Sequence, residues 1–305
     1  MIRFFFKSLQ MNVFNQTDNL RSGSLVIAED VTKTELEKIV QLTGLEKADL
    51  VDIFDIYEVP RFERHDEGLI IHIRHPREGH EGLYTELLTI IYTDSSVFLI
   101  GGNHNPVAQL ILADEKIVTT QRPKMLLKIL SIIARMYTMK VKQVADEVMV
   151  QKRALKKINS TVIARLLENE EVLNQYIASL IPMQNIFQIL SNSKQIMFHE
   201  RDRELFDDVV IGIDQSVNLS QVTLRSMTGL RDSYQIIFTN NLNNTMKFLT
   251  SFTILITIPN IIAGLFGMNV VLPFQDHRFA FWFVILVVFA SCGFIGSIFY
   301  KKRWL

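Results

Sequence analysis

The C-terminal part of the chain, from Phe248 onward, contains two long runs without a single charged side chain. The first run extends from Phe248 to Phe266, and the second extends from Phe279 to Tyr300. As α-helices they would be about 28 and 33 Å long, enough to cross a hydrocarbon core of about 30 Å. A buried hairpin would need a large domain around it, because both runs are apolar on every side. We therefore predict a membrane domain over residues 248–305, with transmembrane helices at 248–266 and 279–300.

The basic residues beside these runs predict their orientation. Lys247 precedes the first run, and Lys301, Lys302 and Arg303 follow the second. Lysine and arginine next to membrane spans are retained on the cytoplasmic side. We expect a multi-pass protein of the cell inner or plasma membrane, surrounded by the lipid bilayer, with the tail 301–305 and both termini in the cytoplasm. The segment 267–278 is then the outer loop.

Composition and motifs argue against several other classes of protein. The chain carries 32 Lys+Arg and 32 Asp+Glu, a net charge of zero, so it lacks the positive excess with which nucleic-acid binders neutralise phosphates. We expect no nucleic-acid partner. The sequence has no phosphate loop, zinc-protease or serine-hydrolase motif, so we expect neither an enzyme nor an organic cofactor. The single cysteine, Cys292, lies in the second apolar run and is predicted to pack as a small hydrophobic residue.

Three histidines, His72, His75 and His80, form a loose cluster in the N-terminal part of the chain. No thiolate or suitably spaced carboxylate completes a four-ligand set around them. We interpret them as solvent-side histidines on a strand and its following turn.

The chain before the membrane domain divides into two regions. Up to about residue 120, short β-rich runs alternate with turns and two short helical stretches, which predicts a cytoplasmic α/β domain over 1–120. Residues 121–247 have little turn punctuation, and no proline lies between Pro182 and Pro259. A helix that starts near Asp202 could therefore continue into the first apolar run over about 100 Å. The predicted fold class is an α+β cytoplasmic domain, a long helical stalk and two C-terminal transmembrane helices.

The stalk has apolar residues at steps of three and four, the period of a helix buried along one seam. Two interpretations remain open: the seam packs against preceding helices of the same chain, or it assembles with copies of itself. The residues of the seam are Leu224, Met227, Leu230, Tyr234 and Ile237.

A stripe of polar or small side chains runs along one face of the first membrane span. Its members recur at steps of three and four, and most of the other residues in the span are Ile, Leu or Phe. Facing lipid, the stripe would leave polar groups without partners at a cost. Tight helix packing also selects small residues, but two asparagines and three threonines are more polar than packing needs. Several copies with this face inward would line a narrow wet path. The stripe consists of Asn243, Met246, Thr250, Thr253, Thr257, Asn260 and Gly264.

The stripe ends at Phe266-Gly267-Met268-Asn269, and here the chain resembles the CorA family of divalent-cation channels. That family carries a Gly-Met-Asn tripeptide at the outer end of the first of two C-terminal transmembrane helices. The segments NTMKFLT, VPRFERHDEGLIIHIR, RELFDDVVIGI and KKRWL also look like the family. The resemblance implies a homopentamer with a funnel-shaped cytoplasmic domain that conducts Mg2+ down its electrochemical gradient.

The resemblance also implies roles for individual residues. Gly267, Met268 and Asn269 would form the selectivity filter. Mg2+ dehydrates reluctantly, so a ring of Asn269 carboxamide oxygens could recognise the ion through its first-shell waters. The positions that match the family's inner polar ring and apolar constriction, which can gate by dewetting, are Asn243, Met246 and Leu249.

Two features of the outer segment depart from the family pattern. Phe266 replaces the common tyrosine, and Gln275 occupies roughly the place of a loop glutamate. Asp276 offers a carboxylate one position along, so an acidic ring at the outer mouth is uncertain from the sequence.

Regulation by cytoplasmic Mg2+ is expected to use carboxylates of the stalk. Mg2+ bridging neighbouring subunits there would favour the closed state. The alternative interpretation is a set of solvated acids near a helix N-terminus, stabilised by the helix dipole. The candidate acids are Glu204, Asp207, Asp208 and Asp214.

Two other functions remain as alternatives. A Zn2+, Co2+ or Ni2+ transporter of the same superfamily would have similar motifs, because ring oxygens that touch only waters discriminate weakly between hydrated divalent ions. A two-span receptor or scaffold would use its membrane part only as an anchor. An anchor would not need the polar stripe, so we favour Mg2+ transport.

Overall fold

The computed structural model describes residues 1–79, 82–153, 160–191, 196, 198, 200–269 and 278–304. These residues form two compact units, Met1–Gly229 and Leu230–Leu305. Helix α5 contributes to both units.

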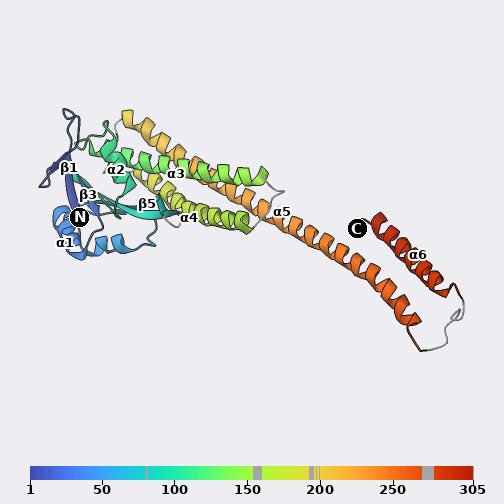
Figure 1. Cartoon of the computed structure of the whole chain (residues 1–305). Coiled ribbons are helices and arrows are strands. Elements are labelled where there is room, and N and C mark those ends of the chain that lie inside the picture. The colour runs from blue at the N-terminus through green and yellow to red at the C-terminus, as the bar shows by residue number, and fades with distance from the viewer. Residues whose placement is uncertain are drawn as a thin grey trace. The chain divides into compact units, whose positions relative to one another are not determined.

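A seven-stranded sheet forms the centre of the first unit, in the order β2-β1-β3-β7-β6-β5-β4 (Figure 1). Only β3 and β7 are parallel to each other, whereas every other neighbouring pair is antiparallel. The strands are β1 (Ile2–Phe6), β2 (Asn15–Thr17), β3 (Ser24–Glu29), β4 (Arg61–Arg64), β5 (Gly68–Gly79), β6 (Gly82–Thr93) and β7 (Ser96–Gly101).

Helix α1 (Lys33–Thr43) and the 3-10 helix η1 (Ala48–Phe54) cover one face of this sheet. Thr32 caps α1 through a capping box with Glu35, and Gly44 ends it at φ 80. These signals fix both ends of the helix, because the side chains satisfy N-terminal N–H groups and glycine tolerates a left-handed conformation. The core between α1, η1 and the sheet includes Leu36, Ile39 and Leu50.

The other face of the sheet is covered by α2 (Pro106–Ala113), α3 (Arg122–Arg153) and α4 (Ser160–Ser191) (Figure 1). Asn105 caps α2 by accepting hydrogen bonds from the N–H groups of Val107 and Ala108. Tyr137 of α3 donates to the carbonyl of Arg74 at 3.0 Å and packs edge-on against Tyr176 of α4. The two long helices are thereby held on β5 and on each other.

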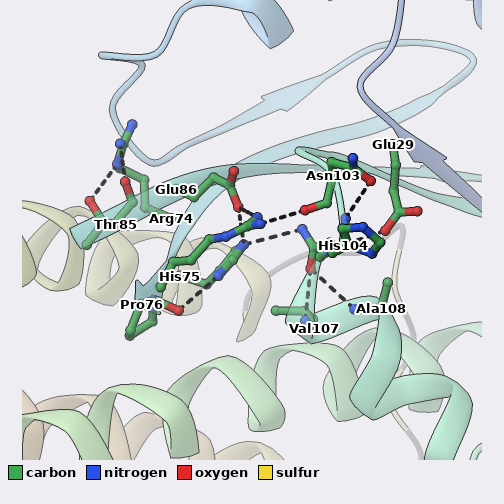
Figure 2. Close-up of polar contacts among 12 residues, drawn as sticks. Glu29, Arg74, His75, Pro76, Thr85, Glu86, Asn103, His104, Val107 and Ala108 are labelled. Atoms are coloured by element: carbon green, nitrogen blue, oxygen red, sulfur yellow. Dashed lines mark hydrogen bonds and ion pairs between the residues drawn. The ribbon is translucent and has the colours of Figure 1, made fainter. Parts of the chain in front are cut away.

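The interpretation of the histidine cluster as solvent-side residues was wrong. Strand β5 continues through Pro76 to Gly79, where a turn was expected, and His72 and His75 are both 0% exposed. They are buried because β5 lies between β4 and β6 and helices cover both faces of the sheet. Arg74 and His75 point to opposite faces (Figure 2), as alternation along a strand requires. His80 lies outside the described residues.

Helix α5 (Glu200–Phe266) is 67 residues long and includes Pro259, and α6 (Ala280–Lys301) has 22 residues. The predicted continuous helix into the membrane span is confirmed. Both helices are long and apolar enough to cross a membrane, and only 6% and 0% of their most apolar stretches are buried. A core hairpin of a soluble protein would have these stretches buried, so the low burial supports membrane helices.

The apolar seam of the stalk is partly explained within one chain. Met227, Leu230 and Tyr234 are 2%, 4% and 5% exposed in the single chain. Packing within the first unit therefore accounts for Met227. The packing leaves Ile236 and Phe238 at 62% and 70% exposed on the next turn.

Candidate ion pathway

Helix α5 carries the whole polar stripe in its second half. From Asn243 to Gly264 the helix rises about 31 Å, the thickness of a hydrocarbon core. All seven residues of the stripe are exposed in the single chain, and a Cβ added at Gly264 would meet no atom within 4 Å. The described part of the chain therefore covers none of this face.

Two of the three threonines of the stripe, Thr253 and Thr257, satisfy their hydroxyl donors within the helix. Thr253 donates to the carbonyl of Leu249 at 2.9 Å, and Thr257 donates to that of Thr253 at 2.7 Å. The expected cost of turning these hydroxyls toward lipid is therefore smaller than the sequence indicated. Their oxygens can still accept hydrogen bonds from water. The need for a polar environment rests more on the carboxamides of Asn243 and Asn260.

Pro259 leaves one carbonyl of α5 without its usual helical partner. Proline has no N–H, so the carbonyl of Leu255, four residues earlier, loses its hydrogen bond. The thiol of Cys292 on α6 lies 3.8 Å from that oxygen and can donate to it. Cys292 thus does more than fill space, and the sequence-based view of it was incomplete. The sequence signal for this contact was Pro259 in the first apolar run together with a hydrogen-bond donor, the thiol of Cys292, in the second.

Helix α6 packs on the side of α5 that lies opposite the polar stripe. At about 100° per residue, Leu255 lies about 200° from Thr253 and about 160° from Thr257. Leu255 contacts α6 through Cys292, and a Cβ added at Gly296 would lie 4.0 Å from the Leu255 side chain. The stripe therefore faces away from α6.

The inner end of α6 carries an aromatic pair that sequence reasoning did not single out. Trp304 stacks on Phe299 with ring centroids 5.6 Å apart, and its backbone N–H donates to the carbonyl of Phe299 at 2.9 Å. Arg303 has φ 56, which turns the chain back after the helix. Tryptophan at such a helix end is typical of a membrane–water interface.

The outer end of α5 coincides with the Gly-Met-Asn tripeptide. The helix ends at Phe266, and the N–H of Gly267 still donates to the carbonyl of Ala263 at 2.9 Å. A Cβ at Gly267 would lie 3.2 Å from that oxygen, tighter than most real contacts, so glycine suits this close approach. Met268 and Asn269 are exposed just beyond the helix. Gln275 and Asp276 lie outside the described residues.

The four candidate regulatory acids lie on α5 within the first unit, and all four are exposed. Asp214 accepts a hydrogen bond from Gln184 of α4 at 2.6 Å. The helix dipole acts mainly in the first turn of a helix. Because α5 begins at Glu200, the acids from Asp207 onward lie beyond that turn. Within the described part of one chain, no group of three or more His, Cys, Asp or Glu residues could hold a metal ion. A metal site at these acids would need ligands from another subunit or water.

Comparison with known proteins shows the family to which the chain belongs. The family model described as "CorA-like Mg2+ transporter protein" matches residues 26–302. The chain belongs to the CorA family. Among its CorA relatives, the cobalt/magnesium transport protein CorA of Methanocaldococcus jannaschii is 24% identical over 287 residues, which cover 90% of this chain and 89% of that protein. The CorA protein of Thermotoga maritima is 21% identical over 280 residues, covering 88% and 80%.

A solved structure of a CorA protein shows the same fold along the whole chain. The complete structure of the CorA magnesium transporter from Methanocaldococcus jannaschii has a TM-score of 0.84 and 22% identity, and the match covers 100% of this chain and 99% of that one. The fold class predicted from the sequence is therefore confirmed: a soluble α/β domain, a long helix and two C-terminal apolar helices.

Proposed function

We propose that the chain forms a homopentameric channel that carries Mg2+ across the cell membrane into the cytoplasm. The observation that carries this proposal is the position of α6, on the face of α5 opposite the polar stripe. Copies of α5 can therefore meet around an axis with their stripes inward while α6 faces outward. The names of the two CorA relatives, which include cobalt and magnesium, support a divalent cation as cargo.

In this proposal Asn269 recognises the ion at the outer mouth. Mg2+ keeps its octahedral waters because their removal is costly. Five carboxamide oxygens can accept hydrogen bonds from those waters, and Gly267 allows the chain to leave the helix beside them. The threonine oxygens of the stripe would then accept hydrogen bonds from waters of the passing ion. No protein group has to replace a first-shell water along this path.

Met246 and Leu249 are proposed as the apolar neck at the inner end. Both side chains are more than half exposed in the single chain, at 54% and 55%, so they are available to meet their copies around the axis. An apolar neck narrow enough to lose its water stops a hydrated ion. The acids of α5 are proposed to bind cytoplasmic Mg2+ between subunits and so favour this closed state.

The test is ion flux into liposomes that contain the purified full-length protein. Mg2+, Co2+, Ni2+ and Zn2+ are compared with and without a proton gradient. We expect Mg2+ uptake, and we expect Asn269→Ala to abolish it while gel filtration still shows the assembled oligomer.

The matched control is Asn241→Ala, which removes another exposed carboxamide from α5. Asn241 lies two positions before the stripe begins and about 200° around the helix from Asn243, so this variant should retain flux. Unchanged Mg2+ flux in Asn269→Ala would refute the proposed filter, and uptake of Zn2+ alone would refute the proposed cargo.

A further inference from the structure

A pocket of about 770 Å³ lies in the first unit, at the carboxyl ends of the parallel strands β3 and β7. Asp30 and Val31 follow β3, and Gly101 and Gly102 end β7 beside them. After these strands the chain continues into α1 on one face of the sheet and into α2 on the other (Figure 1). Open sheets bind ligands at such a divergence of connections. The volume is also in the range of small-molecule sites.

The two glycines at this end of the pocket lie close against neighbouring side chains. A Cβ at Gly102 would lie 2.2 Å from a carboxylate oxygen of Glu86, and one at Gly101 would lie 2.5 Å from the amide nitrogen of Asn105. The backbone of Asp30 adopts φ 46 and its N–H donates to the carbonyl of Gly101 at 3.1 Å. These contacts tie the ends of β3 and β7 together at the pocket.

The single guanidinium in the lining is already occupied by the protein. Arg74 donates to the carbonyls of Ile56 at 2.8 Å and Glu58 at 3.2 Å, and to the carbonyl and hydroxyl of Thr85 at 2.7 and 3.0 Å. Most of its N–H groups therefore have acceptors. Arg74 holds the wall of the pocket and has few donors left for a ligand, but its positive charge remains in the lining.

Carboxylates dominate the charge of the lining. Glu58 pairs with Arg61. Glu86 pairs with Arg77, which also donates to the carbonyl of Asn103; Figure 2 shows where Glu86 and Asn103 lie.

The remaining two carboxylates of the lining, Asp30 and Asp55, are exposed and form no ion pair within 4 Å with any residue that the structure describes. Arg77 and Arg74 interact with them at longer range, and Asp55 accepts a hydrogen bond from the N–H of Tyr57 at 2.8 Å. Asp30 and Asp55 leave negative charge available at the pocket.

The rest of the lining is largely apolar and aromatic. Tyr57 is 83% exposed and Phe54 is 45% exposed, although both are large side chains that usually lose water on folding. Aromatic faces attract cations. A strongly hydrated metal ion gains nothing from an apolar wall, whereas an organic cation can use the wall and the carboxylates together. The apolar part is formed by Ile53, Phe54, Ile56, Val59, Leu87 and Ile100.

We propose that this pocket binds a small organic cation that carries an ammonium group at each end of an apolar body. Asp30 and Asp55 pair with the ammonium groups, and the body lies along the aliphatic and aromatic wall. All lining residues belong to the unit Met1–Gly229, so binding here can be measured whether or not the chain conducts Mg2+.

The test is isothermal titration of the full-length protein in zwitterionic nanodiscs with four probes. The probes 1,8-diaminooctane, 1,8-octanediol and octanedioate share one chain length but differ in charge, and 1,3-diaminopropane keeps the charge without the apolar body. We expect 1,8-diaminooctane to bind at least about tenfold more tightly than each of the others. The double variant Asp30→Asn/Asp55→Asn should lose at least about tenfold in affinity for it. The matched control Asp18→Asn/Asp94→Asn removes two exposed carboxylates that do not line the pocket and should bind as the wild type does.

Several results would overturn the proposal. Absence of binding by 1,8-diaminooctane would do so, as would tighter binding of octanedioate or equal binding of both diamines. An affinity that falls equally in the control variant would assign the effect to general surface charge instead of the pocket.

Discussion

Acidification is expected to weaken the β5–β6 part of the sheet because two buried histidines must remain neutral there. Burial lowers the pKa of His72 and of His75 from 6.5 to about 4. His72 shares a hydrogen bond of 3.0 Å with Thr89. In the neutral form, His75 accepts a hydrogen bond from the side-chain amide of Asn105 at 3.3 Å. Protonation of His75 at that nitrogen would break this hydrogen bond, because two donors would then face each other, although the carboxylate of Glu86 lies 3.6 Å from the same nitrogen.

The sign and size of the effect follow from linkage between protonation and folding. Between pH 6.5 and 4 the unfolded strand binds protons that the folded strand does not, so stability falls as pH falls through this window. At pH 5 each histidine lowers the free energy of unfolding by about 2 kcal/mol relative to pH 7.5, and the two together lower it by about 4 kcal/mol. Above pH 6.5 the two neutral histidines make their full contribution to the free energy of unfolding. A further rise in pH should not change that contribution.

Hydrogen–deuterium exchange of the full-length protein measures this effect locally. The free energy of opening of the β5 and β6 amides, corrected for intrinsic exchange, is compared at pH 7.5 and pH 5. In the variant His75→Gln the loss on acidification should shrink by about 2 kcal/mol. The matched control His104→Gln changes an exposed histidine of the β7–α2 loop and should keep the wild-type loss. Protection that is equal at both pH values, or a loss that His75→Gln leaves unchanged, would refute the reasoning.

Three further predictions concern the membrane part and the stalk. Met246→Ala or Leu249→Ala should raise resting Mg2+ flux by widening the apolar neck, and unaltered resting conductance in both variants would place the gate elsewhere. Cys292→Ala should weaken the α5–α6 contact by about 0.5 to 1 kcal/mol, because the carbonyl freed by Pro259 loses its donor. In a detergent unfolding titration, Cys292→Ser should retain most of the wild-type stability. Equal losses of stability in the two variants would contradict the hydrogen bond. A variant that neutralises the four stalk acids together should need a higher cytosolic Mg2+ concentration to inhibit inward flux. An unchanged inhibition curve would exclude this cluster as the sensor. The variant carries Glu204→Gln, Asp207→Asn, Asp208→Asn and Asp214→Asn.

The membrane helices and the long α5 could be predicted because their signals are local and continuous. The charge-free runs 248–266 and 279–300 specify membrane helices by length alone, and a proline-free stretch permits a helix of any length. Pro259 did not end α5, and Cys292 of α6 supplies a donor near the freed carbonyl. That compensation depends on a residue 37 positions away, which no local pattern contains.

The N-terminal domain was harder to predict because its order depends on distant pairing. Strand β1 begins at Ile2 and pairs with β3, and neither β1 nor β2 was expected from the sequence. The parallel pairing of β3 with β7 joins segments that α1, η1 and the strands β4 to β6 separate in the sequence. It places Asp30 beside Gly101 and so creates the pocket. The burial of His75 likewise depends on α2, α3 and β6, and not on its own neighbours in the sequence.

The direction of the polar stripe is the step that joins the fold to transport. A single chain with this structure exposes the carboxamides of Asn243 and Asn260 on one side of α5 and packs α6 on the other. Because the hydroxyls of Thr253 and Thr257 already bond to their own helix, the two asparagines carry most of the cost of meeting lipid. One α6 per chain cannot cover the stripe, since Cys292 and Gly296 hold it near Leu255 on the opposite face. Other copies of α5, with the water they enclose, would satisfy that face, and this is why oligomerisation and an ion path are proposed together.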